Sequence, residues 1–132
     1  MNSLVVEDDA TQRLFLKKVL EKYGTCDTAE NSTEAETLFR RSLEQKRLYQ
    51  LVCLDILLPG KSGQDLLKEF RSLEKNAGIL FHERCRILMV TALGDLKHVT
   101  EAFASDCDGY LVKPIDPTKL KEKLVSLGLV KE

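Results

Sequence analysis

Polar side chains that could act together follow several short apolar runs of this chain. They are Glu7 and Asp8, Asp55, Thr91, and Lys113. Crowded carboxylates repel one another and need a cation, and an oxygen-only set with few protein ligands suits Mg²⁺ better than Zn²⁺. A lysine and a hydroxyl beside a metal ion are what phosphoryl transfer needs, because they neutralise and hydrogen-bond the transferred oxygens. In such a set Asp55 would be the nucleophile and would form an acyl phosphate.

Asp55 lies within an apolar stretch that starts at Leu51 and is stopped by Pro59-Gly60. A short, nearly unbroken apolar run is typical of a strand buried on both faces of a parallel sheet. An unpaired charge inside such a strand costs several kcal/mol or more. Asp55 is therefore expected where the strand ends and the sheet meets solvent, which is the ligand-binding edge of open α/β sheets. Taken alone, Asp55 would more often be a helix cap or a turn residue than part of a functional site.

Strand and helix patterns alternate five times along the chain. Strands are predicted at residues 4–6, 25–29, from 51, 86–91 and 109–113, and helices at 11–23, from 31 or 32, from 62, 95–104 and 116–127. This alternation predicts an α/β fold with a doubly wound parallel sheet and right-handed crossovers. The carboxyl ends of parallel strands share one edge, so the polar residues listed above can form one site.

Two segments carry more specific expectations. The helix at 11–23 is expected to bury an apolar face that includes Leu14 and Phe15. The stretch from Glu74 to Arg84 has no clear period and is long for a connection. We expect its apolar residues, Leu80 and Phe81 among them, to cover the sheet edge or to extend the preceding helix. The alternative is a docking loop for a partner.

Composition is that of an ordinary globular protein. The 132 residues predict one domain over 1–132, with 43% hydrophobic and 31% charged residues. A net charge of -1 gives no electrostatic footprint for nucleic acid and no polybasic membrane patch. No apolar run reaches the ~18 residues of a membrane span, and the acidic N-terminus is unlike a signal peptide. Four scattered cysteines without a C-x-x-C pair indicate free thiols in a reducing cytosol.

Four motifs together resemble the receiver domains of two-component response regulators, including single-domain chemotaxis regulators. They are Val5-Val6-Glu7-Asp8-Asp9, Leu54-Asp55-Ile56-Leu57-Leu58-Pro59-Gly60 with Gly63, Met89-Val90-Thr91-Ala92, and Tyr110-Leu111-Val112-Lys113-Pro114. They occur in the family's order and spacing, and the match covers essentially the whole chain. The resemblance implies a flavodoxin-like (βα)5 fold with sheet order 2-1-3-4-5.

The resemblance also implies a Mg²⁺ site. Glu7 and Asp8 match the acidic pair, with Asp8 as a direct ligand and Glu7 acting through water. Asp55 would be a further ligand as well as the phosphoacceptor. Leu57 would contribute its backbone carbonyl. Asp9 is expected to be an N-terminal helix charge and not a third acidic ligand.

Further roles carried by the resemblance concern phosphorylation and switching. Thr91 would bind the phosphoryl group, Lys113 would pair with it, and Tyr110 matches the aromatic residue that swings inward on activation. The Lys113–Pro114 bond matches one that is cis in this family. The two residues that flank the approach of hydrolytic water are Leu57 and Leu93, which predicts a long-lived phosphorylated form.

As a receiver, the protein would be a signalling protein that catalyses its own phosphorylation and slow dephosphorylation. It would take a phosphoryl group from a sensor histidine kinase or a phosphotransfer protein. It would then change a surface formed by residues 95–104, 109–113 and 116–127, to which a downstream target protein binds. We expect a cytoplasmic monomer or weak dimer with no nucleic-acid or membrane partner.

Three alternatives remain open. An aspartyl phosphohydrolase similar to the haloacid dehalogenase group would carry a second Asp two residues after the first, where this chain has Leu57. A degenerate receiver used only as a scaffold should lack Lys113 or Asp55, and both are present. No output domain follows Leu129 in this sequence, so the receiver either acts by binding a protein or was excised from a larger regulator.

Overall fold

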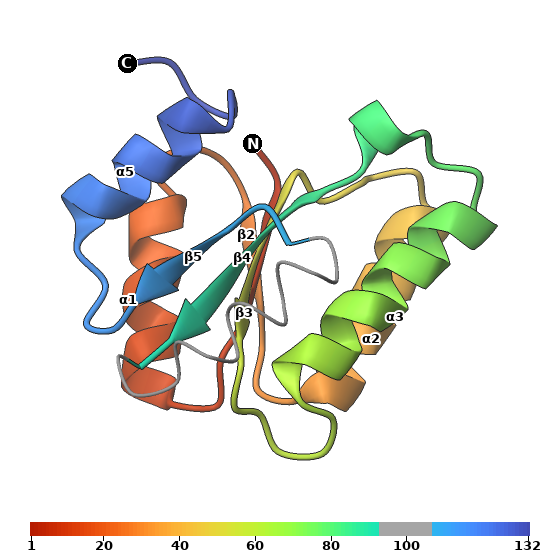
Figure 1. Ribbon diagram of the computed structural model, residues 1–132, viewed down its shortest axis with the longest axis horizontal. Helices are drawn as coiled ribbons and strands as arrows, with labels where there is room; N and C mark the ends of the chain where they lie inside the picture. Colours follow the sequence, from red (N-terminus) through yellow and green to blue (C-terminus); the bar gives the residue numbers. More distant parts are fainter. Residues whose placement is uncertain (93–106) are drawn as a thin grey trace.

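A five-stranded parallel sheet forms the centre of the computed structural model, which describes residues 1–92 and 107–132 (Figure 1). Its strands are β1 (Ser3–Val6), β2 (Cys26–Ala29), β3 (Leu51–Asp55), β4 (Arg86–Thr91) and β5 (Gly109–Val112). Their order is β2-β1-β3-β4-β5, and all four pairings are parallel. The predicted fold class and strand order are confirmed.

Helices cover both faces of the sheet. They are α1 (Ala10–Leu20), α2 (Ser32–Glu44), α3 (Gly63–Asn76) and α5 (Pro117–Ser126), with a 3₁₀ turn η1 (Phe81–Glu83) before β4. Figure 1 shows α1 and α5 on one face and α2 and α3 on the other. The helix predicted at 95–104 lies outside the described residues. No helix within residues 1–92 and 107–132 is long and apolar enough to span a bilayer.

The hydrophobic core has two parts, one on each face of the sheet, and successive residues of a strand contribute to them alternately. Leu4 and Val6 of β1 pack with α2 and α3, whereas Val5 between them packs with α1 and α5. Because successive strand residues point to opposite faces, a central strand of a two-sided sheet must be apolar at every position. This explains why the β1 and β3 sequences read as unbroken apolar runs.

Side-chain caps mark the helix starts that the sequence predicted. Asp9 caps α1 and accepts a 3.0 Å hydrogen bond from Gln12 N. Asn31 caps α2 in the same way, at 2.9 Å from Glu34 N. The Glu34 carboxylate accepts in return from Glu30 N at 2.9 Å, so one more backbone donor near the start of the helix is satisfied. The expectation that Asp9 serves the helix start is thus confirmed.

The prediction for the first helix was wrong in two respects. The helix ends at Leu20 and not at Tyr23, and Leu14 and Phe15 are 53% and 40% exposed. The buried stripe is formed by Leu16, Val19 and Leu20 at helical spacing. Leu14 lies outside this stripe because two residues turn a helix by more than half a turn.

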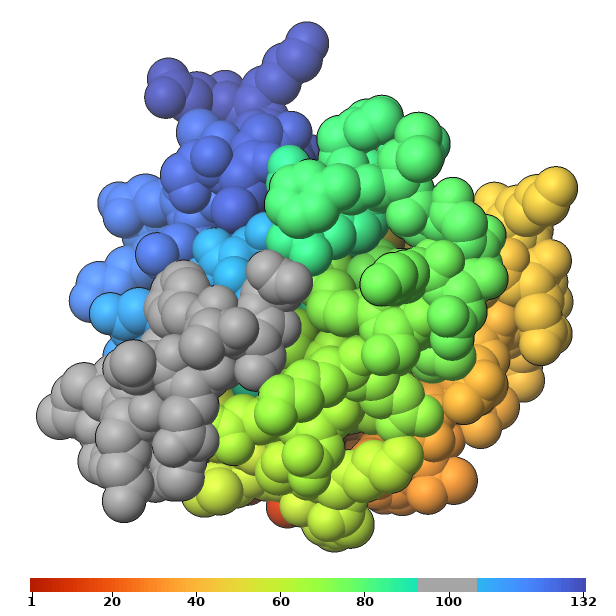
Figure 2. All heavy atoms as spheres, turned by 45° about the vertical axis from the view of Figure 1, so that its right-hand side comes forward, coloured from red at the N-terminus to blue at the C-terminus, as the bar shows by residue number. Residues whose placement is uncertain are grey.

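The segment between α3 and β4 is partly helix and partly exposed. The expectation that its apolar residues extend the preceding helix is wrong, because α3 ends at Asn76, before Ile79, Leu80 and Phe81. The expectation that Leu80 and Phe81 cover the sheet edge is wrong, since they are 57% and 72% exposed. The Arg84 guanidinium lies 4.0 Å from the centre of the Phe81 ring. In Figure 2 this segment is part of the green surface above α3.

A buried polar network anchors this connection to the sheet. Glu74 is 5% exposed, and its carboxylate accepts from Cys85 N at 2.7 Å and from the Arg71 guanidinium at 2.8 Å. The same guanidinium donates to Asp108 at 2.9 Å, and Asp108 also accepts from Ile87 N at 2.8 Å. This network ties α3 to the starts of β4 and β5, and no residue pattern in the sequence predicted it.

Candidate functional site

The polar residues predicted to form a site converge at the carboxyl edge of the sheet. Glu7, Asp55 and Thr91 lie at or just beyond the ends of β1, β3 and β4, and Lys113 follows β5. With Asp8 they line a hollow of about 360 Å³, which we call the acidic site. One carboxylate oxygen from each of Glu7, Asp8 and Asp55 lies within 4.8 Å of the others. The structure therefore brings together all five side chains on which the chemical argument rests.

Lys113 bridges two of the three carboxylates. Its ammonium nitrogen lies 2.9 Å from Oε1 of Glu7 and 3.0 Å from Oδ2 of Asp55. The main chain positions it, because Lys113 N donates to the Thr91 carbonyl at 2.8 Å as β5 ends beside β4. The Lys113–Pro114 peptide bond is cis, as the resemblance implied.

Burial and charge crowding set the electrostatics of the acidic site. Burial, and then the nearby Asp55, raise the pKa of Glu7, which is only 1% exposed. Burial and the neighbouring Glu7 raise the pKa of Asp8. Burial opposes the charged form of Lys113, but its contacts with Glu7 and Asp55 outweigh this and raise its pKa.

The donor set fits a hard divalent cation. It offers only oxygen atoms, and one ammonium faces three carboxylates. Within the described part of the chain, Oε1 of Glu7 is buried and accepts no well-aligned hydrogen bond, so the nearby ammonium is its main compensation. Clustered carboxylate oxygens whose negative charge is not fully compensated favour the binding of Mg²⁺.

Asp55 is held at the end of β3 by its local backbone. Its Oδ1 accepts a 3.1 Å hydrogen bond from Leu57 N, while the Leu57 side chain is 60% exposed. Gly63, the first residue of α3, packs against the Asp55 main chain so closely that a Cβ atom there would collide with the Asp55 carbonyl. Glycine at this position lets α3 begin directly beside the strand end that carries Asp55.

Thr91 and Tyr110 are the two residues expected to act in switching; Thr91 lines the acidic site, and Tyr110 lies on β5. Thr91 is buried, and its hydroxyl donates to the Ala92 carbonyl at 3.0 Å. The Tyr110 side chain is at the surface, 36% exposed, with the Lys123 ammonium 5.6 Å from its ring centre. Leu93, the second residue named for water access, lies outside the described residues.

Arg13 holds the main chain of two acidic-site residues, and its sequence pattern did not predict this role. Its guanidinium donates to the backbone carbonyls of Glu7 at 2.9 Å and Asp8 at 3.3 Å. A second nitrogen lies 3.8 Å from the Glu30 carboxylate. The sequence feature that could have indicated this contact is a basic residue one helical turn after Asp9, on the helix that follows the acidic pair. Its contact is with main-chain atoms, which a residue-type pattern does not reveal.

Comparisons with known proteins agree with this geometry. The family model of the response regulator receiver domain matches residues 3–125. The chain is 35% identical to the regulatory protein VanRB of Enterococcus faecalis over 94% of its own length, and it spans half the length of that protein. It is 33% identical to a chemotaxis protein CheY homolog of Campylobacter jejuni, covering 94% of this chain and 89% of the homolog.

Solved structures give the same result. A response regulator receiver domain protein from Clostridium thermocellum superposes with a TM-score of 0.78 at 26% identity, covering 95% of this chain and 91% of that one. A two-component response regulator from Clostridium difficile also gives 0.78 at 26% identity, over 96% and 94% of the two chains. With its strand order and its acidic edge, the chain belongs to the family of response regulator receiver domains of two-component signalling.

Proposed function

We propose that this receiver accepts a phosphoryl group on Asp55 from the phosphohistidine of a sensor kinase or phosphotransfer protein. The observation that carries the proposal is the position of the Lys113 ammonium, which contacts the carboxylates of both Asp55 and Glu7. It supports the proposal because a cation beside the nucleophile can neutralise charge on a transferred phosphoryl group.

Phosphoryl transfer to Asp55 forms one bond to phosphorus and breaks another. A carboxylate oxygen of Asp55 attacks phosphorus, the phosphorus–nitrogen bond of phosphohistidine breaks, and the leaving imidazole takes a proton from solvent. Lys113 pairs with one oxygen of the transferred group, and the Thr91 hydroxyl donates to another. Because little covalent chemistry is left to the protein, positioning and charge neutralisation account for most of the rate.

The acidic site would hold Mg²⁺ through the carboxylates of Glu7, Asp8 and Asp55 and the backbone carbonyl of Leu57. When bound, the ion would offset the negative charge of the phosphoryl oxygens. The oxygen-only donor set and its excess of negative charge support this assignment.

Phosphorylation would then switch a binding surface. The Thr91 hydroxyl, which now donates to the Ala92 carbonyl, would turn to a phosphoryl oxygen and leave space for the exposed Tyr110 ring. The two conformations must differ by only a few kcal/mol for one phosphoryl group to shift their populations. A target protein would read the change on β5, α5 and residues 95–104.

The phosphohydrolase alternative has no support at the acidic site. A hydrolase of that type needs a second carboxylic acid two residues after the nucleophile, and this position is Leu57. The scaffold alternative predicts a missing nucleophile or lysine, whereas Asp55 and Lys113 are in direct contact.

The experiment is phosphorylation by acetyl phosphate with MgCl₂, followed by intact mass. The parent chain should gain one phosphoryl group, and Asp55→Asn should gain none. Asp65→Asn, which removes an exposed acid in the first turn of α3, is the matched control and should behave as the parent does. Equal incorporation into Asp55→Asn, or none into the parent, would refute the proposal.

A further inference from the structure

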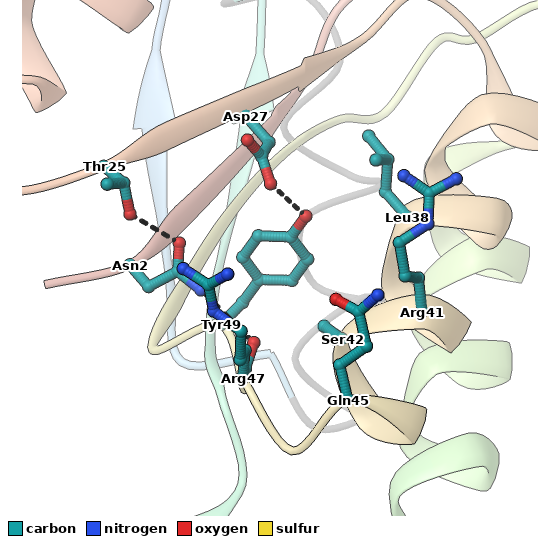
Figure 3. Close-up of a pocket in the computed structure, with 9 residues that line it drawn as sticks. All are labelled: Asn2, Thr25, Asp27, Leu38, Arg41, Ser42, Gln45, Arg47 and Tyr49. Carbon is teal, nitrogen blue, oxygen red and sulfur yellow. Dashed lines mark hydrogen bonds between the residues drawn. The ribbon is translucent and has the colours of Figure 1, made fainter.

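A second polar hollow lies at the opposite edge of the sheet from the acidic site. It has a volume of about 250 Å³. Asn2, Thr25 and Tyr49 line it from just before β1, β2 and β3, at the amino ends of these parallel strands. Arg41 and Arg47 complete much of the wall (Figure 3). We call it the arginine hollow.

The two arginines approach the hollow from different sides. Arg41 comes from the last turn of α2 and Arg47 from the loop that leads to β3, with the Tyr49 ring between them in Figure 3. Within residues 1–92 and 107–132, neither guanidinium forms an ion pair or a hydrogen bond. The neighbouring Arg40, in contrast, pairs with Glu69 at 3.4 Å.

The loop that carries Arg47 is fixed by main-chain contacts. Arg47 N donates to the Ser42 carbonyl at 2.9 Å, and the Asn2 amide donates to the Arg47 carbonyl at 3.3 Å. Lys46, just before it, has a positive φ of 55° and turns the chain sharply. The base of the Arg47 side chain is therefore held in place beside the hollow.

Other polar groups of the hollow already have partners within it. The Tyr49 hydroxyl donates to the Asp27 carboxylate at 2.6 Å, and the Thr25 hydroxyl donates to the Asn2 side-chain oxygen at 2.8 Å. Asp27 is the acidic residue that lines the hollow, so the two guanidiniums outnumber it by one charge. The charged donors that remain available to a ligand are the guanidiniums of Arg41 and Arg47.

We propose that the arginine hollow binds a small phosphomonoester, whose phosphate is recognised by the guanidiniums of Arg41 and Arg47. Guanidinium groups bind oxyanions through paired hydrogen bonds. A phosphate ester presents three acceptor oxygens in different directions, which suits two guanidiniums from different sides better than the two coplanar oxygens of a carboxylate. The arginine hollow would thus be a second phosphate-binding site, independent of the acidic site.

Size and burial restrict the rest of the ligand. The hollow is smaller than the ~300–1,000 Å³ of pockets that hold drug-sized molecules. The Tyr49 ring is 4% exposed, so it offers no free face on which a nucleobase could stack. The ligand is accordingly a compact ester, such as a short polyol or sugar phosphate, and not a nucleotide.

The test is an NMR titration of the folded chain with inorganic phosphate as the probe, in EDTA so that metal-dependent binding at the acidic site is suppressed. The amides of Thr25, Gln45 and Arg47 should shift and saturate. Arg41→Gln and Arg47→Gln should each weaken binding about tenfold, since a hydrogen bond to a charged group is worth ~1.5–3 kcal/mol and 1.4 kcal/mol is tenfold.

Three controls make the outcome decisive. Arg40→Gln, one residue away and paired with Glu69, should bind phosphate as the parent does. Asp55→Asn should also bind it unchanged, which separates this proposal from the phosphoacceptor role. Acetate at equal concentration should bind more weakly. Shifts that do not saturate, an unchanged affinity in both Arg41→Gln and Arg47→Gln, or acetate binding as tightly as phosphate would each overturn the proposal.

Discussion

The Arg13 guanidinium donates a 2.9 Å hydrogen bond to the main-chain carbonyl of Glu7. It donates to the next carbonyl, that of Asp8, at 3.3 Å. Arg13 therefore holds the backbone of the two acidic residues without touching either carboxylate through these bonds. In the proposed metal site it is a positioning residue that decides where the ligand oxygens lie.

Arg13→Gln should weaken Mg²⁺ binding by ~10-fold, the lower end of the range for groups that orient metal ligands. Glu30→Gln is the control, because the Glu30 side chain is 62% exposed and lies 3.8 Å from the guanidinium, where an ion pair contributes little. Isothermal titration with MgCl₂ measures both. Equal Mg²⁺ affinity in Arg13→Gln and the parent would show that the loop keeps its shape without the guanidinium.

Mg²⁺ should stabilise the parent chain against unfolding. An ion that binds only the folded chain adds ~2.7 kcal/mol at a concentration one hundred times its dissociation constant. Asp8→Asn removes one of the three converging carboxylates and should remove much of this gain. Thermal melts with and without millimolar MgCl₂ measure the effect, and a melting temperature of the parent that does not change would contradict the metal site.

Glu7 should make metal-free stability fall as pH rises. Its pKa is raised above the ordinary value of 4.5, so above about pH 4.5 the folded chain retains a proton that the unfolded chain loses. The free energy of unfolding then decreases until pH passes the raised pKa. Urea unfolding in EDTA should show this decline in the parent and a smaller one in Glu7→Gln. If the free energy of unfolding fell more steeply with pH in Glu7→Gln than in the parent, Glu7 would not be the group that retains the proton.

Glu74 should matter for stability and not for phosphorylation. Its buried carboxylate accepts from Cys85 N and from Arg71, so Glu74→Ala leaves a buried donor and a buried cation with fewer partners. Removing one partner of a buried pair typically costs ~3–5 kcal/mol. Denaturant unfolding should show such a loss, whereas Glu44→Ala at an exposed position of α2 should change stability by less than ~0.5 kcal/mol. A loss below about 1 kcal/mol in Glu74→Ala would mean that water replaces the carboxylate.

Leu57 should lengthen the life of the phosphorylated form. Its exposed side chain lines the acidic site, cannot hydrogen-bond water and so cannot orient it for attack. Leu93 is expected to act in the same way, and each 1.36 kcal/mol added to the barrier slows hydrolysis tenfold. Phosphorylated Leu57→Asn/Leu93→Glu should decay faster than the parent when both are followed by intact mass. Equal half-lives would show that these two side chains do not control water access.

The sequence by itself determined the order of the elements and the candidate site. The central strands read as apolar runs because both of their faces are covered, and caps such as Asp9 and Asn31 mark helix starts through bonds to residues three positions later. Because the strands run parallel, their carboxyl ends meet at one edge of the sheet. Asp55 and Lys113, which are 58 residues apart in the sequence, therefore come into contact there. These features depend on local patterns and on the direction of the strands.

Only the tertiary structure decided which side chains are buried and which long-range polar contacts form. Leu14 and Phe15 are apolar residues of the kind found in a core, yet both are exposed. The reason is that the helix turns the stripe containing Leu16 toward the sheet instead. Arg71 meets Asp108 across 37 residues, and Arg13 binds main-chain carbonyls that no residue type reveals. Such contacts depend on how helices rotate and pack against the sheet, and this is determined by the whole core at once.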